Sequence, residues 1–364
     1  MYTGQFIRIS WAGVMSNYFA VLNGVKQGGV VSPVLFCIYI DNLLLQLSRS
    51  GYGCYLGRDF VGAIAYADDI VLISPTPCAM RKLLFICDNF AAQYDLVFNA
   101  VKSKFIVIST SRWRCLIRSF NNCLFSIGGK QIENVSSYVH LGHVINSKFD
   151  DNEDIISRRN HFIGQTNDVL CFFNNMELNV KIKLFRAYCS SIYGCELWSL
   201  DCAAIDTFCA SWRKAIRRLL GLPYDARCYL LPILTNTLSI FDEICKRSAH
   251  FIRSCLLSQY KLVRSITLYS ILHGRYLSVI GKNLLFCCKR FSWNFDDFLL
   301  GDIDWVNEDF MIFNDNKLQD VERSHAQILA ELISLREGSS VFDTGDKFLN
   351  HNEIKMLIDV IATV

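Results

Sequence analysis

The adjacent carboxylates of Asp68 and Asp69 are the residues of this sequence best suited to hold a metal ion. They lie between two apolar runs, and such a pair is costly to bury unless a cation neutralises it. Oxygen ligands on a tight turn suit Mg²⁺. At a hairpin tip both carboxylates can project together, whereas successive side chains within a strand point to opposite faces. The alternative is a solvated turn, in which aspartate is simply a good turn residue.

The apolar runs on either side of these carboxylates predict the hairpin that would present them. Strands are expected over residues 61–66 and 70–73, joined at residues 67–69. The apolar content of both runs is typical of strands that lie deep in a sheet. Pro75 and Pro77 then close the unit.

Short strands around two amphipathic helices are expected in the rest of the first 150 residues. Ser32 as an N-cap and Pro33 at the first helical position predict a helix over 33–48, and another is expected over 79–94. Their apolar faces contain Leu35, Ile38, Tyr39, Leu43 and Leu47 in the first helix, and Leu83, Leu84, Cys87, Phe90 and Ala91 in the second. Strands are expected over 6–9, 18–21, 96–98, 105–108, 124–127 and 138–145, with a turn at Gly128-Gly129.

Helical periodicity replaces this pattern after residue 150. Gly221, followed by Pro223, predicts a helix stop, and Ser239 is a plausible N-cap. Residues 259–316 have no period that can be assigned. Helices are expected over 153–175, 179–199, 202–220, 239–258 and 320–337. The predicted fold class is therefore α+β followed by an all-α region, in three domains over 1–148, 149–258 and 259–364.

Composition excludes some classes of protein without selecting one. The chain has 364 residues, of which 52% are hydrophobic and 20% charged, so wholesale disorder is excluded. The net charge of +3 does not by itself indicate nucleic-acid binding. The N-terminus lacks the apolar core of a signal peptide, and no run of 18 apolar residues is present. We therefore expect an intracellular protein, cytoplasmic or nuclear, with no membrane span.

The sixteen cysteines invite a zinc or disulfide interpretation. Their spacing favours neither, because no pair is spaced C-x-x-C and Cys287 and Cys288 are adjacent. Many lie in apolar runs, as Cys87, Cys189 and Cys255 do. We interpret most of them as buried, reduced thiols in a reducing compartment.

A second candidate motif is the glycine-rich loop over residues 24–33, G-V-K-Q-G-G-V-V-S-P. Glycine allows a backbone to approach a ligand closely. The loop matches neither the Walker pattern nor G-x-G-x-x-G, and an ordinary turn before a helix would explain it equally well. Taken with the Y-A-D-D sequence at 66–69, however, it forms a more specific combination.

Five landmarks in this order resemble the reverse transcriptases of non-LTR retrotransposons. The run from Phe19 to Leu47 is similar to motif B of that family, and Y-A-D-D is similar to motif C. N-A-V-K-S at 99–103 resembles motif D, and Y-V-H-L-G at 138–142 resembles motif E. Y-G-C-E-L-W at 193–198 resembles the segment Y-G-x-E-x-W that follows the palm. The resemblance covers roughly residues 1–220 and implies a partial palm domain, an antiparallel sheet with packed helices, before a helical thumb-like region.

The resemblance implies a two-metal nucleotidyl transfer on a primer–template, with RNA template, DNA primer and deoxynucleoside triphosphates as partners and Mg²⁺ as cofactor. Asp68 and Asp69 would be metal ligands, and Lys102 would protonate the departing pyrophosphate. The template and nucleotide pocket would be lined by Gln27, Gly28, Gly29 and Tyr66, and the primer grip would contain His140, Leu141 and Gly142. Without the resemblance, Lys102 is equally well explained as a solvated lysine at a strand end.

One departure from the family pattern limits the expected activity. The family carries a further metal-binding aspartate, in motif A, before motif B, whereas residues 1–23 contain no Asp or Glu. Two carboxylates on one turn cannot bridge two ions at a spacing of about 4 Å. A missing palm strand would also leave apolar sheet edges exposed. We therefore expect a truncated form, inactive by itself.

A basic stripe lies on the helix expected over 202–220. Arg213 and Arg217 are four residues apart, as are Lys214 and Arg218, beside an apolar face. A solvated helix face would explain the stripe. The resemblance favours contact with the nucleic-acid backbone, to which Arg158 and Arg159 could add.

Three functional hypotheses follow from these features. The first is a polypeptide derived from an RNA-directed DNA polymerase, and the second is a non-catalytic remnant that binds RNA or DNA. The third is an unrelated magnesium phosphohydrolase, which would need further clustered carboxylates or histidines. The loop pair Asp150-Asp151 is the nearest candidate for such a cluster, but it is not part of a motif.

Overall fold

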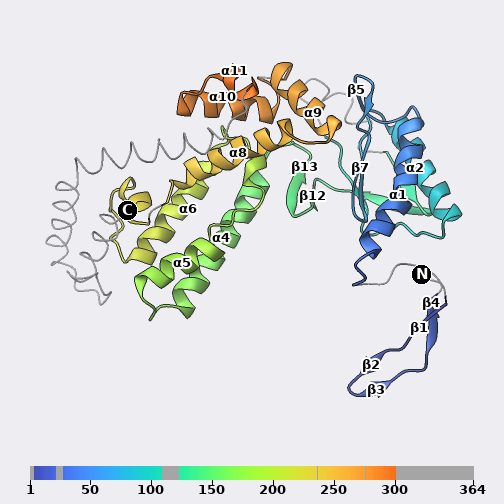
Figure 1. Cartoon of the computed structure of the whole chain (residues 1–364), viewed down its shortest axis with the longest axis horizontal. Coiled ribbons are helices and arrows are strands. Elements are labelled where there is room, and N and C mark those ends of the chain that lie inside the picture. The colour runs from blue at the N-terminus through green and yellow to red at the C-terminus, as the bar shows by residue number, and fades with distance from the viewer. Residues whose placement is uncertain (1–3, 22–27, 109–122, 236, 275, 301–364) are drawn as a thin grey trace. The chain divides into compact units, whose positions relative to one another are not determined.

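The computed structural model describes residues 4–21, 28–108, 123–235, 237–274 and 276–300 (Figure 1). The chain divides into two compact units. The first comprises residues 1–138 with 146–148, and the second comprises residues 139–145 with 149–364. The predicted helix over 320–337 lies outside the described residues. None of the described helices is both long and apolar enough to cross a lipid bilayer.

Short strand pairs and two helices make up the first unit. β1 (Gln5–Ile7) pairs with β4 (Phe19–Val21), and β2 (Ser10–Trp11) pairs with β3 (Val14–Met15) between them. The helices are α1 (Ser32–Arg49) and α2 (Pro77–Gln93). The remaining strands are β5 (Tyr55–Leu56), β6 (Asp59–Phe60), β7 (Ala63–Tyr66), β8 (Asp69–Leu72), β9 (Lys104–Phe105), β10 (Phe125–Ile127) and β11 (Lys130–Asn134).

The core of the first unit lies between the two helices and the sheet of order β10-β11-β9. In that sheet β10 and β11 are antiparallel, whereas β9 runs parallel to β11, so the predicted antiparallel sheet contains one parallel pairing. The predicted apolar face of α2 is confirmed, since all five of its residues are buried. This core contains Leu43, Leu47, Leu83, Leu84, Cys87, Phe90, Phe125, Ile127 and Ile132.

The predicted apolar face of α1 is only partly correct. Leu43 and Leu47 are fully buried, but Ile38 is 66% exposed, and Leu35 and Tyr39 are exposed as well. The buried residues of the N-terminal half are Ser32 and Ile40, so the predicted face is covered by described residues only toward the C-terminal end of the helix. Ser32 is not the N-cap either, because the helix is capped at Val31 and Ser32 is its first residue.

Two strand predictions are wrong in detail. Residues 96–98 form no strand, although Leu96 and Phe98 pack against the core while Val97 is exposed. Alternating burial therefore occurs there without strand pairing. The strand expected over 138–145 is instead two strands, β12 (Ser137–His140) and β13 (His143–Asn146), which form a hairpin. Its turn, at Leu141 and Gly142, has positive φ angles of 47° and 78°.

The second unit is helical. Its helices are α4 (Asn152–Phe172), α5 (Leu178–Tyr188), α6 (Ala203–Leu220), α7 (Leu230–Leu234), α8 (Ile240–Leu256), α9 (Lys261–Leu272), α10 (Val279–Phe291) and α11 (Phe295–Leu300), with a 3-10 turn, η2 (Cys195–Leu197). The predicted stop at Gly221 and N-cap at Ser239 are confirmed, because Gly221 has φ 63° and the Ser239 side chain accepts a hydrogen bond from the Asp242 N–H.

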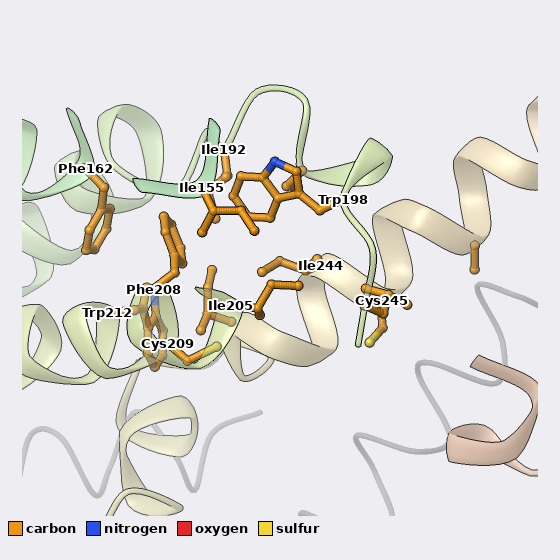
Figure 2. Packing of buried hydrophobic residues seen from close by; sticks show 14 of the residues in the cluster. Ile155, Phe162, Ile192, Trp198, Ile205, Phe208, Cys209, Trp212, Ile244 and Cys245 are labelled. Carbon is orange, nitrogen blue, oxygen red and sulfur yellow. The ribbon is translucent and has the colours of Figure 1, made fainter. Parts of the chain in front are cut away.

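The core of the second unit packs around Trp198, which is fully buried, and includes Ile155 of α4, Phe208 of α6 and Ile244 of α8 (Figure 2). The rings of Trp198 and Phe208 meet edge to face, with centroids 5.7 Å apart. From α10, the Asn283 amide donates to the Trp198 carbonyl at 2.7 Å and accepts from the Leu200 N–H at 2.9 Å. The segment between α5 and α6 is thus held from several helices.

One helix prediction fails in this unit for an identifiable reason. The helix expected over 179–199 ends at Tyr188. Beyond it, Arg247 of α8 donates to the carbonyls of Ser190 and Ile192 at 3.1 and 3.3 Å, so these groups are bonded outside any helix. Residues 259–300, for which no period could be assigned, form α9, α10 and α11. The division into three domains stays a prediction.

Candidate nucleic-acid interface

The carboxylates of Asp68 and Asp69 lie at the tip of the β7–β8 hairpin, as predicted. Tyr66 pairs with Asp69 across the hairpin, leaving Ala67 and Asp68 as a two-residue turn. Ala67 has φ 53°, a left-handed conformation that costs an L-residue about 1 kcal/mol or more. Both carboxylates are exposed, so they have no burial cost that a bound cation would offset.

The prediction that these strands lie deep in a sheet is wrong for the described residues. There the sheet contains only β7 and β8. One face packs on the core through Ala63, Ile70 and Leu72, while Ile64 is 53% and Tyr66 is 66% exposed. The hairpin thus has an uncovered apolar face beside its acidic tip.

A two-ion metal site does not fit the residues that the structure describes. Within the described ranges, no group of three or more His, Cys, Asp or Glu side chains is arranged to hold a metal ion. Asp68 and Asp69 therefore supply two carboxylates where bridging two ions about 4 Å apart needs a larger ligand set. Asp150 and Asp151 have other partners, because Asp150 accepts from the Asn152 N–H at 3.1 Å and Asp151 from the Ser199 N–H at 2.7 Å.

The other predicted nucleotide-binding groups of the first unit lie on exposed turns. Gly28 is exposed with φ 79°, and the Gly29 carbonyl accepts from the Ser32 N–H at 3.1 Å just before α1. Gln27 lies outside the described residues. Lys102 is exposed on a turn in which Asn99 Oδ1 accepts from the backbone N–H groups of Val101 and Lys102, each at 3.1 Å. In N-A-V-K-S, the asparagine therefore shapes the turn that presents the lysine.

In the second unit, the predicted primer-grip residues Leu141 and Gly142 form the turn of the β12–β13 hairpin, and His140 directly precedes them. The Leu141 carbonyl accepts a 3.0 Å hydrogen bond from the Tyr193 hydroxyl. The Gly142 carbonyl accepts one from the Arg158 guanidinium. The turn is therefore bound to both the Y-G-C-E-L-W segment and α4.

A buried carboxylate, Asp154, lies beneath this turn. Its Oδ1 accepts from the Val144 N–H at 3.0 Å, and its Oδ2 accepts from the Trp198 indole at 2.8 Å. Nδ1 of His143 lies 3.3 Å from Oδ2 but makes no aligned hydrogen bond within the described residues. Asp154 is 1% exposed, and its two hydrogen bonds connect the β12–β13 hairpin to Trp198 of the following segment.

Sequence reasoning missed Asp154 and the contacts of Arg158. The available signal was weak, namely an aspartate on the buried side of an amphipathic helix near its N-terminus, where carboxylates are common for other reasons. Arg158 contacts the Gly142 carbonyl and lies 3.7 Å from Asp154, with its guanidinium 5.2 Å from the Tyr193 ring centroid. That it adds to the basic surface of α6 stays a prediction.

The basic stripe on α6 separates into two kinds of residue. Arg217 is half-buried and donates from Nε and Nη2 to the Ala226 carbonyl, at 3.2 and 2.8 Å. Arg218 donates to Asn167 Oδ1 of α4 at 2.8 Å. By exposure, Lys214 and Arg218 are the more accessible cations of the stripe, and Arg213 is partly exposed.

Comparison with known proteins supports the interpretation of the motifs. Residues 2–148 match the family model described as reverse transcriptase (RNA-dependent DNA polymerase). The retrovirus-related Pol polyprotein of type-1 retrotransposable element R2 from Popillia japonica is 28% identical over 137 residues, which cover 36% of this chain and 19% of that protein. That of the type-2 element R2DM from Drosophila melanogaster is 36% identical over 101 residues, covering 28% and 10%.

A third relative extends the similarity into the helical unit. The RNA-directed DNA polymerase from mobile element jockey of Drosophila funebris is 21% identical over 241 residues, covering 62% of this chain and 25% of that protein. Residues 2–148 are therefore similar to a reverse transcriptase domain. The predicted resemblance to non-LTR retrotransposon polymerases is confirmed by these relatives, of whose length the chain spans a quarter or less.

Proposed function

We propose that this chain binds a nucleic-acid primer–template of the kind used by RNA-directed DNA polymerases, and that by itself it does not extend the primer. The observation that carries the proposal is the hairpin tip, where Asp68 and Asp69 are exposed without a third metal-ligating side chain among the described residues. Mg²⁺ would bind these carboxylates weakly, since few protein oxygens are available to it. Tyr66, Gln27, Gly28, Gly29 and Lys102 would face the template and nucleotide, as the family resemblance implies.

The binding surface in the second unit would combine the motif E turn with the accessible cations of α6. Arg213 and Lys214 would contact backbone phosphates, and such contacts release counterions and make the affinity depend on salt. Arg218 would add to them. Arg217, which already donates to the Ala226 carbonyl, would contribute to nucleic-acid binding mainly by holding the loop after α6.

The proposal is tested with poly(rA)–oligo(dT), dTTP and Mg²⁺. No incorporation of dTTP is expected, whereas a fluorescently labelled RNA–DNA hybrid should bind with an affinity that falls as salt rises. Incorporation that disappears in Asp68→Ala would overturn the proposed inactivity. Absent or salt-independent binding of the hybrid would overturn the proposed binding function.

A purely non-catalytic nucleic-acid binder, without any metal-linked role, is the second candidate. It is favoured by the same exposed carboxylate pair, since the described residues give it no further ligands. The two candidates differ in their response to Mg²⁺. If the carboxylates act with the metal, Mg²⁺ should strengthen binding of a deoxynucleoside triphosphate by the wild-type chain but not by Asp68→Ala. For a simple binder, the two proteins should respond alike.

A further inference from the structure

Tyr193 is held in a fixed position without being buried. Its side chain is 57% exposed, although its hydroxyl donates a 3.0 Å hydrogen bond to the Leu141 carbonyl. The Arg158 guanidinium lies 5.2 Å from the ring centroid, within range of a cation–π interaction. A side chain fixed in this way has already lost much of its rotamer freedom, so a ligand that stacks on it has less entropy to remove.

Two glycines allow this close arrangement. Gly142 has φ 78°, and a Cβ placed there would lie 3.3 Å from Cε1 of the Tyr193 ring. Gly194 has φ 81°, and a Cβ there would lie 3.2 Å from Nδ1 of His143. Any other residue would be strained in its backbone at either position and would crowd the neighbouring ring. The hairpin turn and the residue pair Tyr193-Gly194 therefore fit against one another directly.

Buried or partly buried polar side chains bind the segments on either side of Tyr193 and the neighbouring hairpin. Asp154 binds the Val144 N–H of the hairpin and the Trp198 indole of the Y-G-C-E-L-W segment with its two carboxylate oxygens. Arg247 binds the carbonyls of Ser190 and Ile192 just before Tyr193. The exposed ring is thus fixed by contacts on both sides of it in the sequence.

This surface combines an exposed aromatic ring, an aliphatic side chain and a partly buried cation. Leu141 is 41% exposed beside Tyr193, and the nearby cation is Arg158, whose side chain is 22% exposed and lies 3.7 Å from Asp154. An aromatic face next to a guanidinium suits a nucleotide, because the base can stack while its phosphate is neutralised. An apolar protein partner would gain less from such a surface, since the cation would have to be desolvated.

We infer that Tyr193 is a nucleic-acid contact residue whose exposed ring stacks on a base of the bound strand, with Asp154 as a positioning residue that holds the ring and the Leu141-Gly142 turn as one surface. This inference rests on the proposed nucleic-acid binding function. It assigns a contact role to Tyr193, which lies outside the predicted primer grip, and a positioning role to Asp154, which acts only through other residues.

The test uses an RNA–DNA hybrid with a single-stranded template overhang and measures binding by fluorescence anisotropy. Tyr193→Ala should weaken binding roughly 5- to 150-fold, the range for loss of one stacked base. Tyr193→Phe keeps the ring and should weaken binding less. Tyr224→Ala is the matched control, because Tyr224 is 92% exposed in the same unit, and it should bind like the wild type. Equal affinities of Tyr193→Ala and Tyr224→Ala would overturn the inference.

A second readout reports stacking directly. Two hybrids are compared, one with 2-aminopurine at the primer end and one with it in the overhang. In one of these two hybrids, the 2-aminopurine fluorescence should fall when the wild-type chain binds. That quenching should persist in Tyr193→Phe and be lost in Tyr193→Ala, and in Asp154→Asn it should be reduced while the salt dependence of binding stays unchanged. Binding without any quenching, or quenching that survives in Tyr193→Ala, would contradict the inference. If the wild-type chain does not bind the hybrid at all, the proposed function itself fails.

Discussion

The indole Nε1 of Trp198 donates a 2.8 Å hydrogen bond to Oδ2 of Asp154, and both side chains are buried. This bond joins helix α4 to the segment between α5 and α6, 44 residues further along the chain. Because the other oxygen of Asp154 accepts from the Val144 N–H, one carboxylate connects the β12–β13 hairpin to the segment that contains Trp198.

Trp198→Phe should lower the stability of the second unit by about 2–4 kcal/mol, because it removes a donor from a buried carboxylate and leaves a small cavity. Urea unfolding followed by far-UV circular dichroism measures the change. Trp11→Phe is the control, since Trp11 is 82% exposed and its replacement should change stability by no more than about 0.5 kcal/mol. Similar small effects of both substitutions would show that the buried bond contributes little.

Ala67→Gly should stabilise the first unit by about 1 kcal/mol. Ala67 has φ 53°, and glycine adopts this conformation without the steric cost that an L-residue carries. Ala65→Gly, two residues earlier in β7, should instead destabilise it by roughly 0.5–1 kcal/mol, because a strand interior gains nothing from the added freedom. Thermal unfolding of both variants checks the difference, and a loss of stability in Ala67→Gly would contradict the assigned turn.

Stability should fall at alkaline pH because burial raises the pKa of several thiols. The pKa is raised to about 12 for Cys87 and Cys195 and to about 11 for Cys209. Above the ordinary thiol pKa of about 8.5, the unfolded chain releases these protons while the folded chain keeps them. Each thiol therefore contributes stability that is full below that pH and is lost by about 1.4 kcal/mol per pH unit until its folded pKa is reached.

The measurement is urea unfolding at pH 8, 9 and 10. Cys209→Ala should make the fall of the free energy of unfolding with pH less steep, by up to the contribution of one thiol. This holds whatever the substitution does to stability at pH 8. Cys37→Ala is the control, because Cys37 is exposed and its replacement should leave the slope unchanged. A slope that is the same in Cys209→Ala and the wild type would show that the buried thiol does not stay protonated.

Arg217→Ala should mainly lower the stability of the fold, whereas Lys214→Ala should mainly lower the affinity for the hybrid. Arg217 holds the Ala226 carbonyl with two hydrogen bonds, so its loss should cost about 1.5–3 kcal/mol of stability. Lys214 is exposed, so its loss should leave stability unchanged but weaken hybrid binding and reduce its salt dependence by about one counterion. Unfolding curves and salt titrations of both variants decide the matter, and equal salt slopes would argue against phosphate contact by Lys214.

Local features of the fold were predictable from the sequence. The β7–β8 hairpin follows from two apolar runs around a turn, and the buried face of α2 follows from helical periodicity. The end of α5 did not, because Arg247, more than fifty residues away, binds the carbonyls of Ser190 and Ile192. The helix α9 was missed because it buries Thr267 and Ile271 while Leu268 and Leu272 are exposed, which leaves no apolar stripe to detect.

The candidate site was predictable where one motif suffices and unpredictable where two segments meet. The sequence placed Asp68 and Asp69 at a hairpin tip because both lie in a single short pattern. The covered face of that hairpin depends on which neighbours are present, and the residues that hold the Leu141-Gly142 turn come from α4 and from the segment around Tyr193. Spacing along the chain carries no information on such pairings.

The hydrogen bonds of Asn283 to the Trp198 carbonyl and the Leu200 N–H set a lower limit on the smallest fragment of this chain that could fold independently. A fragment ending at residue 258, where helical periodicity stops being readable in the sequence, would keep Trp198 and Leu200 but lose the α10 side chain that binds the backbone of both. It would also lose Arg290, which pairs with the buried Asp242 of α8 at 2.6 Å. Any minimal fragment of the helical unit must therefore extend through α10.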